Sequence, residues 1–195
     1  MLLQRDFYAR DTLTVARALL GQRLVREING RRLAGRIVEV EAYVGEDDHA
    51  CHAHCGPTQR NAPMYGPPGR SYVYLIYGMY HCLNTVTQEE GFPAAVLIRA
   101  LEPLEGVEAM RERRGGRPDR QLTSGPGRLC QALDIDRQLN GVDLCTRSAC
   151  LYIERDVEIE AAAIAETPRV GVRGDELAVA VPWRFSVSGS PFVSR

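Results

Sequence analysis

The fold depends on the stretch Gly69-Arg-Ser-Tyr-Val-Tyr-Leu-Ile-Tyr-Gly-Met-Tyr-His-Cys-Leu-Asn84. β-branched and aromatic residues fill it and Gly78 interrupts it, which predicts a β-hairpin with its tip at Tyr77-Gly78-Met79. In a strand that ends at Tyr77, the side chains of Tyr72 and Tyr74 share one face. Such tyrosines usually pack a sheet. The alternative is an aromatic platform that stacks on bases, beside an exposed wedge at the turn.

A strand over residues 35–44 is expected to carry two carboxylates. It follows Asn29-Gly30, which is the strongest signal for a tight hairpin turn. A period of two places Glu39, Glu41 and Tyr43 on one face of this strand. That face is either a solvated surface or a carboxylate beside an aromatic wall, where desolvation would raise its pKa towards that of a general base. The sequence does not choose between the two glutamates.

An arginine interrupts the apolar segment at residues 94–101, which has the pattern of a buried strand. A buried guanidinium is costly unless it is paired or lines a cavity. We therefore expect Arg99 either to satisfy a structural carboxylate or to lie in a site beside Glu39 or Glu41.

The remaining elements predict an α+β fold, because short strands alternate with helices and antiparallel hairpins. At 195 residues, the chain suits a single compact domain over residues 1–195. Helices are expected over residues 11–21, 103–114 and 123–133, and further strands over residues 151–153, 157–159, 169–172 and 184–187.

The composition is that of a soluble globular protein, with 45% hydrophobic and 25% charged residues. The formal net charge of −1 does not by itself indicate a nucleic-acid binder. All 24 positive residues are arginine, however, and arginine binds phosphate through a bidentate fork and stacks on bases. Because the chain has no lysine, only the Met1 α-amino group could supply the amine of a Schiff-base mechanism.

The sequence shows no long apolar run and no signal-peptide pattern at its start, which predicts a cytoplasmic protein that does not enter a membrane. The six cysteines are then expected to be free thiols. Three histidines and two cysteines lie between His49 and Cys55 and could form a zinc module. Their spacing does not match the usual zinc layouts, so we expect no metal here and a histidine in a site loop instead.

Six blocks occur in an order that is familiar from a known family: Glu39-Val-Glu-Ala-Tyr43, Tyr72-Val-Tyr-Leu-Ile-Tyr-Gly-Met-Tyr80, Leu97-Ile-Arg-Ala-Leu-Glu-Pro-Leu-Glu-Gly106, Ser124-Gly-Pro-Gly-Arg-Leu-Cys-Gln-Ala-Leu133, Arg169-Val-Gly-Val172 and Gly189-Ser-Pro191. From about residue 5 onward, the chain resembles the alkyladenine (3-methyladenine) DNA glycosylases. This resemblance implies a curved antiparallel sheet with flanking helices and a protruding hairpin. It also implies a monomer that needs no metal or cofactor and acts in the cytoplasm, at the nucleoid of a bacterium.

The resemblance implies a role for each matching residue. Glu41 is the general base that activates water, and Arg99 helps to hold that water and the abasic-site backbone. Tyr43, His52 and Tyr74 stack on the flipped-out base, with His54 as the alternative to His52. Asn84 crowds the amino group of guanine, Val170 and Gly171 lie near the pocket, and Tyr77 enters the duplex where the base was. Tyr80, Met64, Ser124 and Arg128 are the candidates for contact with the DNA backbone.

The activity implied is that of a monofunctional DNA glycosylase on double-stranded DNA. Such an enzyme flips out alkylated or deaminated purines, hydrolyses the N-glycosidic bond and initiates base excision repair without a lyase step. A catalytically silent damage-binding module is the first alternative; it would be expected to have lost Glu41 or Arg99, and both are present. A zinc-dependent nucleic-acid module is another. A carbohydrate or RNA binder of formyltransferase-like fold is a third, based on fold similarity alone.

Overall fold

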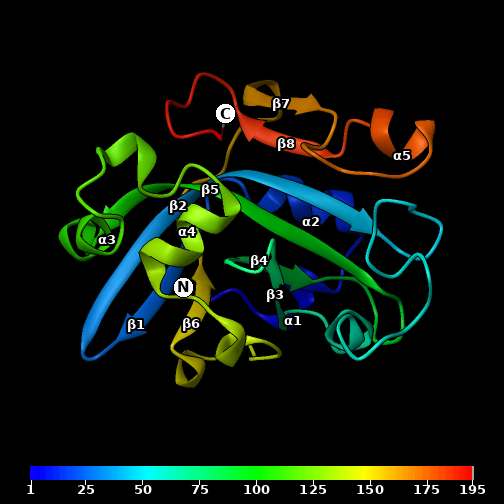
Figure 1. The fold of residues 1–195 in the computed structure, drawn as a ribbon, viewed down its shortest axis with the longest axis horizontal. Helices are drawn as coiled ribbons and strands as arrows, with labels where there is room; N and C mark the ends of the chain where they lie inside the picture. The colour runs from blue at the N-terminus through cyan, green and yellow to red at the C-terminus, as the bar shows by residue number, and fades with distance from the viewer. Residues whose placement is uncertain (195) are drawn as a thin grey trace.

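One antiparallel sheet of eight strands organises the protein, and the computed structural model describes residues 1–194. The main path of the sheet is β3-β4-β5-β2-β1-β6, and β8 joins β2 on one side and β7 on the other. Figure 1 shows β2 and β5 as long neighbouring strands that cross the molecule. The strands are β1 (Arg23–Ile28), β2 (Arg31–Val44), β3 (Ser71–Ile76), β4 (Tyr80–Val86), β5 (Ala94–Glu105), β6 (Leu151–Glu154), β7 (Ile164–Thr167) and β8 (Arg184–Val187).

Five α-helices flank this sheet, so the expected α+β class is confirmed. They are α1 (Arg5–Tyr8), α2 (Thr12–Leu19), α3 (Val107–Arg113), α4 (Pro126–Leu133) and α5 (Glu176–Ala180). No helix in the described part of the chain is long and apolar enough to cross a membrane.

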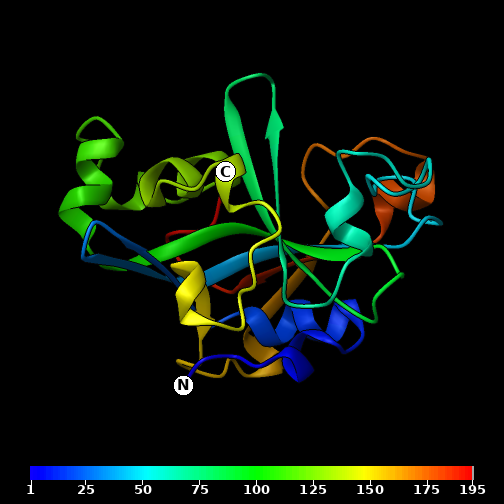
Figure 2. The same cartoon turned by 90° about the horizontal axis from the view of Figure 1, so that it is seen from below.

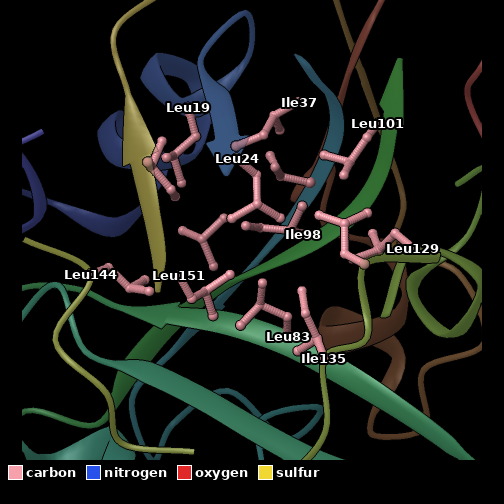
Figure 3. Packing of buried hydrophobic residues seen from close by; sticks show 14 of the residues in the cluster. Leu19, Leu24, Ile37, Leu83, Ile98, Leu101, Leu129, Ile135, Leu144 and Leu151 are labelled. Carbon is pink, nitrogen blue, oxygen red and sulfur yellow. The ribbon is translucent and has the colours of Figure 1, made fainter. Parts of the chain in front are cut away.

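The core lies where α2 and α4 pack on the sheet. Asp11 caps α2 by accepting a hydrogen bond from the amide of Thr14, and Val15, Ala16 and Leu19 of α2 are fully buried. Figure 3 shows Leu83, Ile98 and Leu129 meeting in this core from β4, β5 and α4. Each fully buried leucine contributes roughly 1.5–3 kcal/mol to stability, so this cluster holds the central strands in a fixed register.

The two predicted hairpins are present. Asn29 and Gly30 both have positive φ and join β1 to β2, as the Asn-Gly signal indicates. The hairpin of β3 and β4 stands out from the body, between the side of α3 and α4 and the loop that follows β2 (Figure 2). Its exposed tip is the most prominent projection of the molecule in that view.

The register between β2 and β5 is irregular next to the two glutamates. Val38 on β2 and Arg99 on β5 are each left without a directly paired residue, because the pairing shifts on both sides of Glu39. Such bulges bend a strand and redirect its side chains. Here the irregularity places the guanidinium of Arg99 beside both Glu39 and Glu41.

Several predicted element bounds were wrong. The strand that begins at Ala94 continues to Glu105, and helix α3 begins only after Gly106, whose φ of 69° turns the chain. Residues 157–159 and 169–172 form no strand. Their backbone amides bind other groups: that of Val157 donates to the carbonyl of Gly21, and that of Val170 donates to Glu41. Strand β7 and helix α5 were not predicted.

Candidate active site

A hollow of about 1220 Å³ opens at the base of the protruding hairpin. Every predicted site residue except Glu41 lines it: Tyr43, His52, Met64, Tyr74, Tyr77, Tyr80, Asn84, Arg99, Ser124, Arg128, Val170 and Gly171. The fold thus brings residues from four strands, from helix α4 and from the connecting segments to one place. Glu41 is fully buried immediately behind this lining, in contact with three residues that form it.

Aromatic rings form one wall of the hollow. The rings of Tyr72 and Tyr74 lie 5.3 Å apart on the same face of β3, as the period of two predicts. The His52 ring meets Tyr74 edge-on at 4.5 Å, and its Nδ1 lies 2.8 Å from the hydroxyl of Tyr72. Asn84 is held across the hairpin, where its side-chain amide donates to the carbonyl of Tyr72. These rings present flat, electron-rich surfaces of the size that a purine needs for stacking.

The aromatic groups remain neutral at physiological pH. Burial, together with the positive charge of Arg60, lowers the pKa of His52 to about 4, although part of the residue is exposed. Burial and the nearby Glu41 carboxylate raise the pKa of Tyr43 well above its ordinary value. Burial also raises the pKa of Tyr74, with a further contribution from Cys82. These aromatic side chains therefore do not repel a positively charged purine in the hollow.

Arg99 joins the two carboxylates of β2 at the back of the hollow. Its Nε donates to Oε1 of Glu39 at 2.9 Å, and its Nη1 lies 3.2 Å from Oε1 of Glu41. All three side chains are almost fully buried. Burial alone would lower the pKa of Arg99, but the two carboxylates hold it above its ordinary value, so the guanidinium stays charged. Arg99 thus pairs with both carboxylates and also lines the hollow, while its role in a site remains a prediction.

Glu39 and Glu41 have different surroundings. Glu39 accepts hydrogen bonds from Arg99, Arg184 and Ser194. Burial would raise the pKa of Glu39, but the Ser194 hydrogen bonds and the two arginines together bring it below its ordinary value. Glu41 instead accepts the amide of Val170 at 2.7 Å and the hydroxyl of Tyr43 at 2.8 Å, both from groups that border the hollow. Glu41 is thus the carboxylate that faces the aromatic wall.

The hairpin tip carries Tyr77 in a strained position. Tyr77 and Gly78 both have positive φ, 53° and 70°, and the Tyr77 side chain is 81% exposed. The left-handed conformation costs a non-glycine residue about 1 kcal/mol or more. A large aromatic side chain held outward at that cost is poorly explained by packing, since nothing in the hairpin covers it. This placement matches that of a wedge.

The candidate backbone contacts lie on both sides of the hairpin. Tyr80 packs on Gly127 at the start of α4, where an added Cβ would come within 3.1 Å of its ring. The exposed Arg128 donates to the carbonyl oxygen and the hydroxyl of Ser124. Tyr80, Ser124 and Arg128 therefore form one surface. Met64 differs, because it is 2% exposed and packs with Tyr72 and Cys51, which leaves little side-chain surface for a DNA backbone.

The three histidines between residues 49 and 54 contact different polar groups, although the rings of His49 and His54 lie 3.9 Å apart. His49 pairs with Asp175, His52 lies against Tyr72, and His54 contacts the carbonyl oxygen of Glu46. Among residues 1–194, no group of three or more His, Cys, Asp or Glu side chains is placed to hold a metal ion. Of the two candidate histidines, it is His52 that lines the hollow.

The sequence of this chain is similar to that of known proteins. Residues 6–191 match the family model of the methylpurine-DNA glycosylases. The chain belongs to the methylpurine-DNA glycosylase family. A protein from Methanocella arvoryzae is 53% identical over 194 residues, covering 99% of this chain and 96% of the relative. A protein from Carboxydothermus hydrogenoformans is 49% identical over the full length of both chains. Each relative carries the name "Putative 3-methyladenine DNA glycosylase".

Family membership confirms the resemblance found in the sequence and makes the protein a DNA glycosylase, a hydrolase of N-glycosidic bonds in DNA. The roles of individual residues remain predictions. In this methylpurine-DNA glycosylase, the geometry adds residues that the sequence pattern did not reveal. Cys82 lines the hollow opposite Tyr74, and Asn61 holds the His52 loop through the carbonyl oxygens of His52 and Gly56.

The most connected of these additional residues is Arg169. Its guanidinium forms a bidentate pair with Asp48, and both side chains are essentially inaccessible to solvent. It also donates to the carbonyls of Ala42 and Ala178 and lies 4.8 Å from the ring of Tyr43. Arg169 therefore fixes the position of the next residue, whose amide binds Glu41. Its place in the Arg169–Val172 block was the only signal in the sequence.

Proposed function

We propose that this protein is a monofunctional DNA glycosylase that releases alkylated purines, above all 3-methyladenine and 7-methylguanine, with Glu41 as the base. One observation carries the proposal: Glu41 is held by Arg99, Tyr43 and the Val170 amide at the border of an aromatic hollow. A buried carboxylate with these partners can orient a water molecule towards C1′ and accept its proton. The family membership supports the reaction class.

Entry of the base begins with flipping. Unstacking and unpairing a nucleotide costs a few kcal/mol, and least at a damaged or mismatched base. The exposed Tyr77, in the turn between β3 and β4, would fill the gap that the base leaves. The basic surface at Arg128 then lies beside the hairpin, where phosphates of the bent strand would pass.

Recognition follows from the charge of the lesion. Alkylation at N3 or N7 gives the purine a positive charge, and such a ring stacks favourably on Tyr43, His52 and Tyr74 through cation–π attraction. The side chain of Asn84 is fixed by the Tyr72 carbonyl and borders the hollow, so it can exclude a purine with an extra amino group. One such contact would favour a purine without the extra amino group over one that carries it by roughly 1–3 kcal/mol.

The positive charge of the alkylated purine also promotes cleavage of the N-glycosidic bond. The alkylated base leaves readily as a neutral molecule, while the sugar acquires positive character that the anionic Glu41 stabilises. Water adds to C1′, Glu41 takes its proton, and Arg99 keeps the carboxylate oriented. Neutral lesions such as hypoxanthine and ethenoadenine need a proton on the leaving base, so we expect slower release of these. Because the chain has no lysine side chain for a Schiff base, the product is an intact abasic site.

The deciding experiment is base release from duplex oligonucleotides that carry 3-methyladenine, 7-methylguanine, hypoxanthine or ethenoadenine. We expect release by the wild type and its loss, by at least about a hundredfold, in Glu41→Gln with lesion binding retained. Glu39→Gln, two residues away, is the comparison; because Glu39 holds Arg99, we expect its rate to fall, but less than that of Glu41→Gln. If Glu39→Gln abolishes release and Glu41→Gln does not, the assignment of the base is wrong.

The same experiment tests the alternative function. Glu41 is fully buried and does not itself line the hollow, which is an arrangement that a catalytically silent damage-binding module would also tolerate. Tight binding of lesion-containing duplex by the wild type without release of any of the four bases would establish that alternative.

A further inference from the structure

The segment from Gly189 to Ser194 returns from strand β8 to the back of the hollow. The amide of Ser190 donates to the carbonyl of Val187 and so forms a turn. Ser194 lies among the residues that line the hollow. This brings Ser194 into contact with Glu39, which precedes it by 155 residues in the sequence. The family block at Gly189-Ser-Pro191 stops short of this residue, and nothing in the local sequence pattern around Ser194 indicates a role.

Ser194 makes three polar contacts with the buried charges. Its backbone amide donates to Oε2 of Glu39 at 2.6 Å, and its hydroxyl donates to Oε1 at 2.8 Å. The same hydroxyl accepts a hydrogen bond from Nη2 of Arg99 at 3.1 Å. Ser194 therefore bridges the two partners of an ion pair that is itself almost fully buried.

The two glutamates differ in how many acceptor positions are occupied. A carboxylate has about four lone-pair sites. Within the described residues, Glu39 receives four hydrogen bonds: three reach Oε1, from Arg99, Arg184 and the Ser194 hydroxyl, and one reaches Oε2, from the Ser194 amide. Within residues 1–194, Glu41 has three polar partners, and only the Tyr43 hydroxyl reaches its Oε2. Each Oε2 atom thus has one donor, but that of Glu41 is bonded to Tyr43, whose ring lines the hollow, whereas that of Glu39 depends on the Ser194 amide alone.

We propose that Ser194 is a positioning residue that makes Glu39 the structural partner of Arg99 and so reserves Glu41 for the attacking water. The inference rests on the proposed function of Glu41. Without Ser194, Glu39 keeps only its two arginine contacts, and Nη2 of Arg99 loses its acceptor. Glu39 then has free acceptor positions and competes for water, while the orientation of Arg99 towards Glu41 is no longer fixed.

The electrostatics of the cluster agree with this geometry. The charged groups that face Glu39 are Arg99 and Arg184, with Glu41 on the far side of Arg99. Burial would raise the pKa of Glu39, and the hydrogen bond from the Ser194 amide is the largest influence that lowers it. Glu39 consequently stays ionised, and keeps Arg99 in place, at a lower pH than it would without Ser194.

The kinetic test compares four variants in single-turnover release of 7-methylguanine between pH 5 and 9. Ser194→Ala removes the hydroxyl, Ser194→Pro removes both the hydroxyl and the amide donor, and Ser194→Thr restores the hydroxyl. Ser188→Ala is the matched control, because Ser188 is exposed on the same segment. From the value of hydrogen bonds to charged groups, we expect rates lowered roughly tenfold in Ser194→Ala and roughly a hundredfold in Ser194→Pro.

The pH profile separates positioning from mere stability. We expect the acid limb of the rate profile to move to higher pH in Ser194→Ala, further in Ser194→Pro, and not at all in Ser194→Thr or Ser188→Ala. Melting temperatures measured in parallel identify any variant that is partly unfolded. Unchanged rates and an unchanged acid limb in both Ser194→Ala and Ser194→Pro would overturn the inference.

A second measurement does not depend on activity. The carboxyl carbon of Glu39 is followed by NMR as a function of pH in the wild type and in Ser194→Pro, with Glu39→Gln to assign its signal. We expect Glu39 to titrate at higher pH in Ser194→Pro. If the wild type releases no base, the proposed function fails, but this titration still decides the role of Ser194. An identical titration in both proteins means that Ser194 does not control Glu39.

Discussion

The hydroxyl of Tyr43 donates a hydrogen bond of 2.8 Å to Oε2 of Glu41, two residues earlier on the same strand. The two side chains share a face of β2 because strand side chains alternate. Tyr43 therefore combines two tasks, since its ring borders the hollow while its hydroxyl orients the carboxylate behind it. The pair links recognition of the base to the group that we propose as the catalyst.

Replacing Tyr43 by Phe separates these two tasks. The ring remains for stacking, but Glu41 loses a donor, and a hydrogen bond to a charged group is worth about 1.5–3 kcal/mol. We expect single-turnover base release to fall roughly tenfold or more while the affinity for lesion-containing duplex changes little. Tyr43→Leu is the comparison, because it should reduce both. Equal losses of binding and rate in Tyr43→Phe would contradict the division of roles.

The buried pair of Arg169 and Asp48 should dominate the stability of the pocket loops. Asp48→Asn leaves a buried guanidinium without its counter-charge, so we expect a loss of about 3–5 kcal/mol in the free energy of unfolding. The control is Glu166→Gln, which breaks the exposed pair with Arg17 and should cost no more than about 1 kcal/mol. Both are measured by chemical denaturation. A cost in Asp48→Asn as small as that in Glu166→Gln would show that Asp48 does not compensate Arg169.

Tyr77 should affect DNA binding without affecting folding. Its side chain is 81% exposed, so Tyr77→Ala should leave the melting temperature almost unchanged. Loss of one stacking aromatic is worth about 1–3 kcal/mol, which predicts lesion-duplex binding weaker by roughly 5- to 150-fold. Leu75→Ala removes another exposed side chain of the same hairpin and should bind normally. Binding is measured by fluorescence anisotropy; unimpaired affinity of Tyr77→Ala would exclude the wedge.

His52 should make the protein less stable in mild acid. Its pKa is lowered from 6.5 to about 4 in the folded protein, by burial first and then by the charge of Arg60. Between these two pH values the unfolded chain binds more protons than the folded one, so the free energy of unfolding decreases as the pH falls. The effect is absent above pH 6.5 and complete below pH 4.

Comparison with His52→Gln isolates this contribution. The difference in stability between the wild type and His52→Gln should be constant from pH 7 to 9 and should shift against the wild type as the pH is lowered towards 4. Denaturant titrations at each pH provide the measurement. Parallel curves for the two proteins over the whole range would show that His52 titrates normally.

Local patterns were sufficient for the two hairpins and for the strand faces on which the candidate site residues lie. Asn29-Gly30 set one turn, the break at Gly78 set another, and alternation placed Tyr72 with Tyr74 and Glu39 with Glu41. These features depend on neighbours in the chain, and therefore on preferences that a short stretch carries by itself. The six sequence blocks also identified the family before any contact was known.

The family resemblance implied Glu41 as the base, but the different surroundings of Glu39 and Glu41 are visible only in the tertiary structure. Both lie on the same face of the same strand, so no periodic pattern separates them. Their partners come from distant segments: Ser194 and Arg184 for Glu39, Val170 for Glu41. The bulge that aims Arg99 at both glutamates depends on the register between two strands, where a slip of one residue would reverse every side chain. The sequence alone determined which residues alternate and turn; long-range register and packing decided which of them meet.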